Sequence, residues 1–369
     1  MTTRAFAFYR IPYQTTVHVV RQGLQPMAYA DVEALLGGSG FVVAPFMASD
    51  RCPMLRILPD EECAMSQDAV MEPLRRWCDE ALYGEELDDA AVADGAVAST
   101  HGAVATPHGA GTSRDDYHRA FTLFHGCVAS RQLEKVVLAR ESVMSDSGQH
   151  PVALFQRACQ TYPRMFIALT YTRQSGLWLT ATPEVLLEQE PPQWHTVALA
   201  GTMRYEEGRE PRWSDKNIGE QRIVVDYVSQ LLCTHATDVI QTSAQTVRAG
   251  HLMHLRTDFR FTLADAPAAA ALVQALHPTP AVCGLPKDAA LRLIAEHEDT
   301  CRRYYSGYTG PWRLQGGSHL YVSLRCMTHE GAAWRLFAGG GIVPDSDEQS
   351  EWNETEEKLL TMKRMLFSV

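Results

Sequence analysis

The segment FAGGGIVPDSDEQSEWNETEEKLLTMKR, residues 337–364, places three consecutive glycines just before a turn and an acidic helix. Glycine lets the backbone approach a ligand closely, so that its N–H groups can point at an oxyanion that Cβ atoms would crowd. Gly339, Gly340 and Gly341 therefore predict a glycine-rich loop that binds a small anion. The turn at 344–347 leads from this loop into the helix.

The predicted helix carries charged side chains on one face. Glu351 and Glu354 are three residues apart, and Glu354 and Lys358 are four apart, so the three side chains are neighbours. Carboxylates at this spacing repel each other unless a cation lies between them, which favours an anion held through a metal ion. The alternative is an ordinary solvent-exposed ion pair between Glu354 and Lys358.

Composition limits the classes of protein to which this chain can belong. Its 369 residues are 46% hydrophobic, enough for a large core in one big domain or two moderate ones. A net charge of -11 argues against nucleic-acid binding, because a phosphate backbone is bound by a basic face. A dianionic small molecule stays compatible with this charge, since local arginines, backbone donors and a cation set the field of a site.

Neither a membrane segment nor a leader is expected. The sequence has no run of about eighteen apolar residues, and residues 1–14, MTTRAFAFYRIPYQ, lack the cationic and apolar regions of a secretory signal. We therefore expect a cytoplasmic protein with no membrane partner. The nine cysteines form no CxxC pair, and Cys159, Cys233 and Cys326 have apolar neighbours, so we expect reduced and mostly buried thiols.

The order of the predicted elements favours an α+β fold. Residues 90–113, rich in Ala, Gly, Ser, Thr and His, predict a flexible connector between residues 1–89 and 114–369. Hairpins that alternate with helices favour mixed or antiparallel sheets over a parallel doubly wound sheet. The predicted helices are at 69–82, about 116–132, 153–162, 219–236 and 286–298. The predicted strands are at 39–46, 55–60, 134–140, 165–172, 176–182 and around 243–261 and 318–337, with a hairpin within WHTVALAGTMRY, 194–205.

Further segments carry recognisable residues in a fixed order: EKVVLAR (134–140), TATPEVLLE (180–188), VALAGTMR (197–204), SDKNIGEQRIVVDYV (214–228), HLMHLRTDF (251–259), LHPTPAVCGLPKDAAL (276–291), RRYYSGYTGPW (302–312) and YVSLRC (321–326). With residues 337–364, they resemble the signatures of the chorismate-utilising enzymes, the family of isochorismate, salicylate, anthranilate and aminodeoxychorismate synthases. The resemblance runs from about Asp115 to the C-terminus. It implies two facing mixed or antiparallel sheets, helices packed outside and a cleft between the sheets, with residues 1–89 as the N-terminal variable part.

Lys135 is the candidate general base. Strand alternation puts Lys135, Val137 and Ala139 on one face, where desolvation or a nearby cation would favour loss of the ammonium proton. From the residue alone, a solvent-exposed strand end is the commoner explanation. The resemblance implies the role of base, because members that add water carry lysine here, whereas anthranilate synthases carry glutamine.

Glu184 is the candidate general acid. It follows a strand and a proline at a strand exit where a cleft can form, and burial there would raise its pKa toward a value useful for protonating a leaving hydroxide. A Pro-Glu step is also an ordinary first turn of a helix. In the family that this chain resembles, the glutamate has the acid role.

Glu220 and Glu354 are the candidate Mg²⁺ ligands, and Glu351 is expected to contribute directly or through water. Mg²⁺ prefers oxygen ligands and keeps several waters, so a few carboxylates plus a substrate carboxylate suit it. The alternative for Glu220, at the start of a long predicted helix, is a surface acid favoured by the helix dipole. The family commonly has a histidine after this glutamate, and this chain has Gln221.

Several segments offer donors for the two carboxylates of chorismate. Arginine has a planar fork that suits bidentate carboxylate binding. Tyr305 resembles the ligand-facing turn of the family, and His277 resembles its ring-proximal histidine; a lone histidine is also often a hydrogen-bonded core group, so both interpretations of His277 stay open. The remaining candidates are Arg325, Lys358 and the backbone of Ala200, Gly201, Thr202, Gly339, Gly340 and Gly341.

The resemblance implies isochorismate synthase activity, in which chorismate is isomerised with Mg²⁺ by water addition at C2 and loss of the C4 hydroxyl, and the product feeds menaquinone or siderophore biosynthesis. A salicylate synthase, which would also eliminate pyruvate, stays the closest alternative, although the short chain favours isochorismate. Ala200 stands where aminodeoxychorismate synthases carry lysine, and Lys135 and the lack of an amidotransferase domain disfavour anthranilate synthase. A non-catalytic chorismate-binding subunit is the alternative from another class. We expect a monomer.

Overall fold

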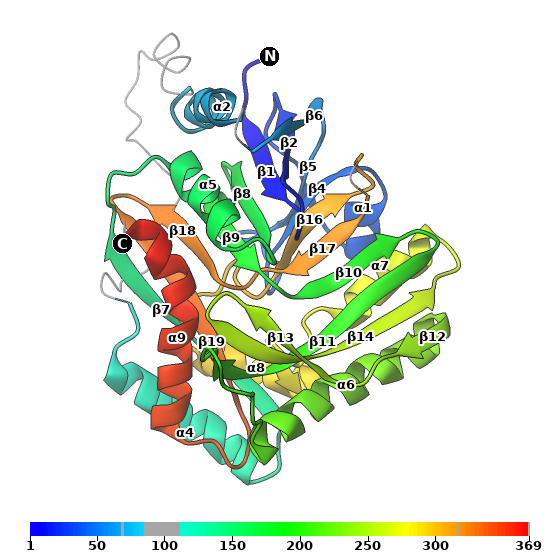
Figure 1. Ribbon diagram of the computed structural model, residues 1–369, viewed down its shortest axis with the longest axis vertical. Helices are drawn as coiled ribbons and strands as arrows, with labels where there is room; N and C mark the ends of the chain where they lie inside the picture. The colour runs from blue at the N-terminus through cyan, green and yellow to red at the C-terminus, as the bar shows by residue number, and fades with distance from the viewer. Residues whose placement is uncertain (68–69, 85–110, 316, 368–369) are drawn as a thin grey trace.

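Two large sheets dominate the computed structural model, which describes residues 1–67, 70–84, 111–315 and 317–367. One sheet has nine strands and the other ten, and helices lie on the outer face of each (Figure 1). Every described strand pair is antiparallel, which confirms the predicted α+β class with facing sheets. Residues 90–110 of the predicted connector lie outside the described residues.

The nine-stranded sheet contains the predicted strand of Lys135. This strand, β7, pairs with β19 along ten residue positions, 136–145 with 333–342, which is why the segments 134–140 and 337–342 lie side by side. The strand order is β15 (Gly284–Leu285), β7 (Lys135–Ser145), β19 (Ala333–Ile342), β18 (Cys326–Glu330), β9 (Gly176–Thr182), β8 (Phe166–Thr172), β1 (Ala5–Arg10), β2 (Thr16–Gln22), β6 (Glu61–Ser66).

The ten-stranded sheet corrects one sequence prediction. WHTVALAGTMRY is not a hairpin; all of it except Tyr205 lies in a single strand, β11, and the turn that precedes it is the Pro191–Pro192 step after β10. The strand order is β12 (Thr237–Gln241), β14 (Leu252–Thr262), β11 (Gln193–Arg204), β10 (Val185–Glu190), β17 (His319–Val322), β16 (Tyr308–Trp312), β4 (Gly40–Ala44), β5 (Met54–Ile57), β3 (Ala28–Tyr29), with β13 (Gln245–Ala249) also paired to β14.

The helices follow the predicted ones with three differences. The five-residue helix α1 (Val32–Leu36) was not predicted. Helix α6 begins four residues earlier than predicted, because the Ser214 side chain accepts a hydrogen bond from Asn217 N and caps it. Helix α7 was not predicted, although Asp265 caps it in the same way through Ala268 N. The helices are α1 (Val32–Leu36), α2 (Met71–Tyr83), α4 (Arg114–Ala129), α5 (Pro151–Thr161), α6 (Asp215–His235), α7 (Ala266–Leu276), α8 (Lys287–His297) and α9 (Glu348–Leu366).

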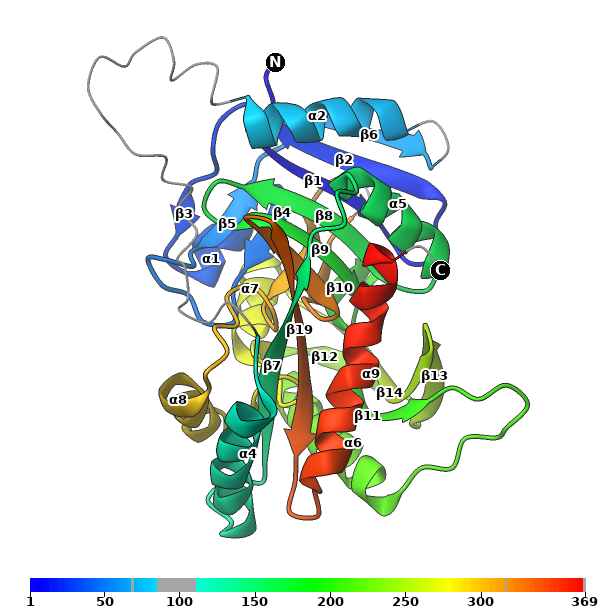
Figure 2. The ribbon, with the colours of Figure 1, turned by 90° about the vertical axis from the view of Figure 1, so that its left-hand side faces the viewer.

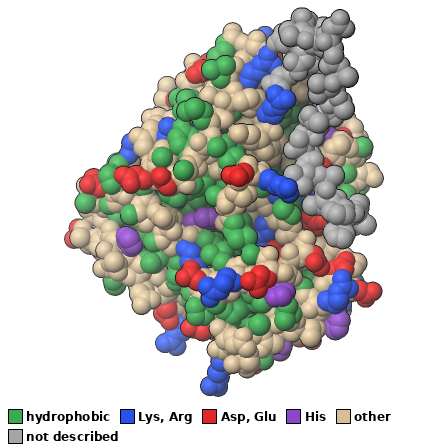
Figure 3. Space-filling model, turned by 180° about the vertical axis from the view of Figure 1, so that it is seen from behind, with side chains coloured by type: hydrophobic (Ala, Val, Ile, Leu, Met, Phe, Trp, Pro, Cys, Tyr) green, Lys and Arg blue, Asp and Glu red, His purple; other side chains and the backbone are tan. Residues whose placement is uncertain are grey.

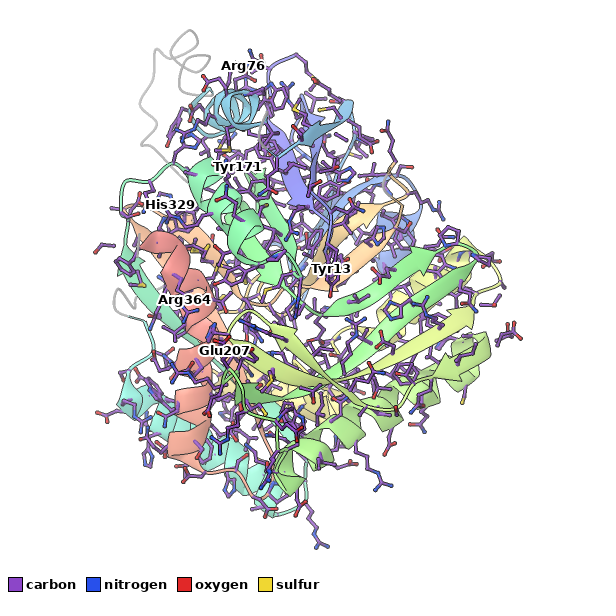
Figure 4. The ribbon with its side chains drawn as sticks, in the orientation of Figure 1. Tyr13, Arg76, Tyr171, Glu207, His329 and Arg364 are labelled. Atoms are coloured by element: carbon purple, nitrogen blue, oxygen red, sulfur yellow. The ribbon has the colours of Figure 1, made fainter. Side chains whose placement is uncertain are left out.

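The core has layers on both sides of each sheet. Helices α2, α5 and α9 bury their apolar faces on the nine-stranded sheet, α1, α6 and α7 on the ten-stranded sheet, and α4 and α8 pack near β7. A separate apolar cluster, which includes Phe41, Leu199 and Phe337, fills the space between the sheets. Helix α9 runs alongside β19 (Figure 2). It also contacts the end of β11, where Nε of Arg204 lies 3.8 Å from Oε2 of Glu357; Figure 4 labels Arg364 on the helix and Glu207 in the loop that follows β11.

Residues 1–67 belong to the same two sheets as the rest of the chain. They supply β1, β2 and β6 to one sheet and β3, β4 and β5 to the other.

Among the described cysteines Cys159 and Cys326 are buried as predicted, but Cys233 is exposed because it lies on the outward face of α6. In the described part of the chain no helix has the length and apolar composition needed to cross a bilayer. Acidic and basic side chains are interspersed on the face seen in Figure 3.

Candidate active site

A pocket lies between the two sheets, beside α6 and α9. Its walls include strands β7 and β19 of one sheet and β11 and β14 of the other. Of the predicted site residues, Lys135 and Gly340 lie directly behind its wall, and Glu351 and Glu354 contact residues near it. The predicted site residues that line the pocket are Glu184, Ala200, Gly201, Thr202, Glu220, Tyr305, Arg325, Gly339, Gly341 and Lys358.

The three glycines do not form the predicted anion-binding loop. They lie inside β19, where Gly339, Gly340 and Gly341 pair with residues 137–139 of β7. Glycine is needed at these positions because other side chains occupy the space that a Cβ atom would fill. A Cβ atom on Gly341 would lie 2.3 Å from Oε1 of Glu220, and a Cβ on Gly339 would lie 2.9 Å from the Tyr305 hydroxyl. The predicted loop is therefore wrong, and the glycines let side chains approach the strand. Gly339 and Gly341 still line the pocket, and anion binding by their backbone stays a prediction.

Lys135 and Glu220 form a buried ion pair. Nζ of Lys135 lies 2.8 Å from Oε1 of Glu220, and the two side chains are 0% and 10% exposed. The solvent-exposed alternatives for both residues are therefore wrong. Burial raises the pKa of Glu220, but Lys135, Lys358 and Lys216 outweigh it and lower this pKa overall. Glu220 lies in the second turn of α6, because the helix begins before its predicted start.

The other two predicted metal ligands are also paired with lysines. Oε1 of Glu354 lies 2.8 Å from Nζ of Lys358, and because the side chains are only 17% and 18% exposed, this is not a solvent-exposed helix pair. Glu351, 1% exposed, forms an ion pair with Lys216 of α6 and accepts a hydrogen bond of 2.7 Å from Oγ of Ser346. Its second oxygen, Oε2, is buried and has no hydrogen-bond partner among the described residues.

We refer to Lys135–Glu220, Lys216–Glu351 and Lys358–Glu354 as the three lysine–glutamate pairs. Burial lowers the pKa of Lys216, but the three glutamates outweigh it and raise this pKa overall, so Lys216 is a cation shared among them. Burial, and next Glu354, raise the pKa of Glu351. In the part of the chain that the structure describes, no group of three potential ligands is arranged to hold a metal ion. The carboxylate oxygens and the unpartnered Oε2 nevertheless suit Mg²⁺ chemically, provided that a lysine gives way.

Glu184 lies on the pocket wall in the short connection between β9 and β10. Strand β10 begins at Val185, so the alternative that Glu184 starts a helix is wrong. The residue is 3% exposed. Burial raises its pKa to about 7, against the opposing effect of Lys135, Arg325 and Lys358. A carboxyl with this pKa is substantially protonated near neutral pH and can donate a proton to a bound ligand.

Arg325 is held by a histidine that the sequence analysis did not select. One guanidinium nitrogen donates to Nε2 of His254 at 2.7 Å, and Nδ1 of His254 in turn donates to the Gly201 carbonyl at 2.9 Å. Since guanidinium has no acceptor, Nε2 must be the unprotonated nitrogen. Burial, and next Arg325, lower the pKa of His254, so its ring is neutral. The other terminal nitrogen of Arg325, NH1, is buried without a partner among the described residues and can bind a ligand carboxylate.

His277 does not join the other predicted residues. Its Nε2 lies 3.1 and 3.2 Å from the carbonyl oxygens of Pro45 and Phe46, and its ring meets Tyr308 edge-on. Burial, and next Lys287, lower its pKa to about 4. The interpretation as a hydrogen-bonded core group is therefore correct. The histidine in the pocket is His254, whose signal in the sequence is a polar residue between Met253 and Leu255 inside a strand.

The backbone at residues 200–202 bulges toward the pocket. The pairing of β11 with β14 is irregular between Ala200 and Met203, and Gly201 has a φ of 69°, a conformation that favours glycine. A Cβ atom at this position would lie 3.3 Å from Asn217 in the first turn of α6. Gln221, at the position where the family commonly has histidine, donates to the Ala198 carbonyl at 2.9 Å. These contacts fix α6, and with it Glu220, against β11.

Solved structures share this fold along almost the whole chain. The menaquinone-specific isochorismate synthase MenF of Escherichia coli superposes with a TM-score of 0.75 over 100% of this chain and 90% of its own, at 23% identity. A structure described as a 2,3-dihydroxybenzoate-specific isochorismate synthase, DhbC of Bacillus anthracis, gives a TM-score of 0.76 over 99% and 97%, at 21% identity. At this level of identity the likeness concerns the fold.

Curated sequences are more similar over shorter stretches. The isochorismate synthase EntC of Escherichia coli is 32% identical over 244 residues, which cover 63% of this chain and 62% of the relative. The isochorismate synthase MenF of Bacillus subtilis is 28% identical over 305 residues, 80% of this chain and again 62% of the relative. The chain thus spans less than two thirds of the length of these relatives. The family model described as chorismate binding enzyme matches residues 80–367, and the chain therefore belongs to the chorismate-binding enzyme family.

Proposed function

We propose that this protein is an isochorismate synthase, an isomerase that transfers the hydroxyl function of chorismate from C4 to C2. Glu184 is the observation that carries the proposal, because it is a buried carboxyl with a pKa of about 7 on the wall of a pocket that Arg325 and Lys358 also line. The names of the relatives EntC and MenF support this choice within the family.

The charges around the pocket suit a small dianion. The three lysine–glutamate pairs are each neutral, so the guanidinium of Arg325 is left as a cation without a carboxylate partner among the described residues. Its buried NH1 donor would bind one carboxylate of chorismate, and Lys358, which also lines the pocket, would contact the other. The neutral ring of His254 orients Arg325 without competing for the anion.

In the proposed reaction Glu184 donates its proton to the C4 hydroxyl, which leaves as water. A second water adds its oxygen at C2 and transfers a proton to Lys135. One C–O bond breaks and one forms, and exchange with solvent restores the acid and the base, so the product is an isomer of chorismate and the reaction is reversible. Glu184 is thus the general acid and Lys135 the general base, and each transfers one proton per turnover.

Lys135 can accept a proton only as a free amine, and it holds one while it is paired with Glu220. It does not line the pocket itself. Its Cε lies against Gly341, 2.8 Å from the position that a Cβ atom would occupy, and both Gly341 and Glu220 do line the pocket. Glu220 and Gly341 thus separate Lys135 from a ligand in the pocket. Breaking the ion pair with Glu220 would free Lys135 to act as the base.

Glu220, Glu351 and Glu354 would hold the Mg²⁺ ion that the resemblance implies. When bound, the ion would neutralise and orient a carboxylate of chorismate. The protein contributes oxygen ligands fixed by two helices, α6 and α9, on opposite sides of the end of β19. The isochorismate formed in this pocket would feed menaquinone or siderophore biosynthesis.

Product analysis tests the proposal. Purified protein is given chorismate and Mg²⁺, and the mixture is followed by chromatography and by salicylate fluorescence, with a parallel sample that contains ammonium. We expect isochorismate to accumulate, activity to vanish in EDTA and to return with Mg²⁺. Salicylate as the main product would identify a salicylate synthase, and anthranilate formed only with ammonium would show that Lys135 does not restrict the nucleophile to water. Chorismate binding without any product would indicate a non-catalytic subunit.

A further inference from the structure

Glu351 is the most deeply buried carboxylate of the three lysine–glutamate pairs. It is 1% exposed, and Lys216 is its only cationic partner among the described residues. Its other contact is the hydroxyl of Ser346, which is neutral, and Oε2 has no hydrogen-bond partner among the described residues. A buried carboxylate without a counter-ion is strongly unfavourable, so Lys216 neutralises Glu351 in the absence of any other cation.

Lys216 is the lysine of the three pairs that can leave most easily. It lies in the first turn of α6, which follows the exposed residues 206–212, and its side chain is 23% exposed. Lys135 is fully buried, and Lys358 also donates to a backbone carbonyl of β19 at 2.8 Å. The ammonium of Lys216 can therefore move into solvent through rotations of its own side chain, while the strands and helices stay in place.

We propose that Lys216 is an internal counter-cation that competes with Mg²⁺ for Glu351: its ammonium neutralises the carboxylate in the metal-free protein and is displaced when the metal ion binds. The inference rests on the proposed function only in taking Glu351 as a metal ligand. An ammonium and a divalent cation on one carboxylate repel each other strongly in a buried site, so the two occupy it in turn. Lys216 thus weakens Mg²⁺ binding and protects the metal-free fold from an unpaired buried charge.

Isothermal titration of the full chain with MgCl₂ tests this competition. Lys216→Met keeps the length of the side chain and removes its charge, and we expect it to lower the dissociation constant for Mg²⁺ about tenfold, because no ammonium has to be displaced. In EDTA the same variant should unfold at a lower temperature than the wild type, since Glu351 has lost its counter-ion. Lys216→Arg, which keeps the cation, should restore that melting temperature and bind Mg²⁺ like the wild type or more weakly.

Lys363→Met is the matched control. Lys363 forms an ion pair of 2.9 Å with Glu356 on α9, outside the pocket, and its side chain is also 23% exposed. This variant should bind Mg²⁺ as the wild type does. Mg²⁺ affinity that is unchanged or weaker in Lys216→Met would overturn the inference, because Lys216 would then have no effect on Mg²⁺ binding or would strengthen it. Absence of Mg²⁺ binding in both wild type and Lys216→Met would overturn it as well.

These measurements contain no chorismate. A wild type that binds Mg²⁺ and forms no isochorismate would therefore refute the proposed function and leave the competition standing. Conversely, a protein that forms isochorismate, but whose Lys216→Met variant binds Mg²⁺ no more tightly, would refute the competition alone.

Discussion

Glu184 links the burial of one carboxyl to the pH range of the proposed reaction. Its pKa is raised to about 7, first by burial and against three nearby cations, and a general acid works only in its protonated form. The turnover number should therefore fall as the pH rises above about 7, because a growing fraction of Glu184 has lost the proton that it has to donate.

Replacement of Glu184 tests this assignment. Glu184→Gln keeps the size of the side chain and removes its acidity, so kcat should drop at least about a hundredfold and the decline at alkaline pH should disappear. Initial rates of chorismate consumption between about pH 6 and pH 9 would measure both effects. A variant that keeps the alkaline decline would assign the titration to another group.

Lys135 has two separable roles, as the partner of Glu220 and as the proposed base. Lys135→Arg keeps a cation beside Glu220 but cannot release its proton near neutral pH, so it should fold normally and lose kcat at least about a hundredfold. Lys135→Ala should lose activity too and should also cost about 3–5 kcal/mol of folding free energy, because it leaves Glu220 buried without its closest partner. Steady-state rates and urea unfolding separate the two effects, and an active Lys135→Arg would exclude Lys135 as the base.

Prediction from the sequence reached the residues that the family resemblance indicates and missed residues that contact a distant partner. Lys135, Glu184 and Glu220 were selected because their segments resemble the family signatures. Glu184 and Glu220 line the pocket, and Lys135 is paired with Glu220. His254 acts through Arg325, 71 positions further along the chain, and Lys216 acts through Glu351, 135 positions away. No periodicity within a segment indicates such pairs.

At the scale of elements, β19 shows how a strand can be mistaken for a loop. Alternation of side chains is the signal of a strand, and three consecutive glycines carry no side chains that could alternate. The pairing of Gly339, Gly340 and Gly341 with β7 is set instead by the neighbouring residues of both strands. Helix α7 was missed for a related reason, since its segment APAAAALVQAL is apolar on most sides and shows a weak helical period.

Gly341→Ala tests the proposal that β19 lacks side chains in order to make room for the site. The added Cβ would lie 2.3 Å from Oε1 of Glu220 and 2.8 Å from Cε of Lys135, so the buried pair or the strand must shift. We expect a loss of about 1–3 kcal/mol in folding free energy from overpacking, together with a large loss of kcat. Gly126→Ala on α4, where a Cβ would meet nothing within 4 Å, should leave activity unchanged and stability equal or slightly higher. Wild-type activity in Gly341→Ala would contradict the proposal.

At the scale of the whole molecule, the two sheets bring together segments that are far apart in the sequence. Residues 6–10 of β1 pair with residues 167–171 of β8, so the first strand belongs to the same sheet as β7 and β19, which line the pocket. The fold class followed from the alternation of hairpins and helices and from the resemblance. Within residues 1–67, β1 pairs with β2 and β4 pairs with β5, but the sequence could not show which sheet each pair joins, because the connecting partners β8 and β16 lie far along the chain.

Oxygen labelling tests the central claim, water addition at C2 with loss of the C4 hydroxyl, most directly. Chorismate is incubated with the protein and Mg²⁺ in H₂¹⁸O, and isochorismate is isolated early in the reaction and analysed by mass spectrometry. We predict that each isochorismate molecule carries one heavy oxygen, at the C2 hydroxyl, while unreacted chorismate is still unlabelled. Isochorismate that contains no heavy oxygen would contradict the account, because its hydroxyl would then have come from C4 of the same molecule and not from a water activated by Lys135.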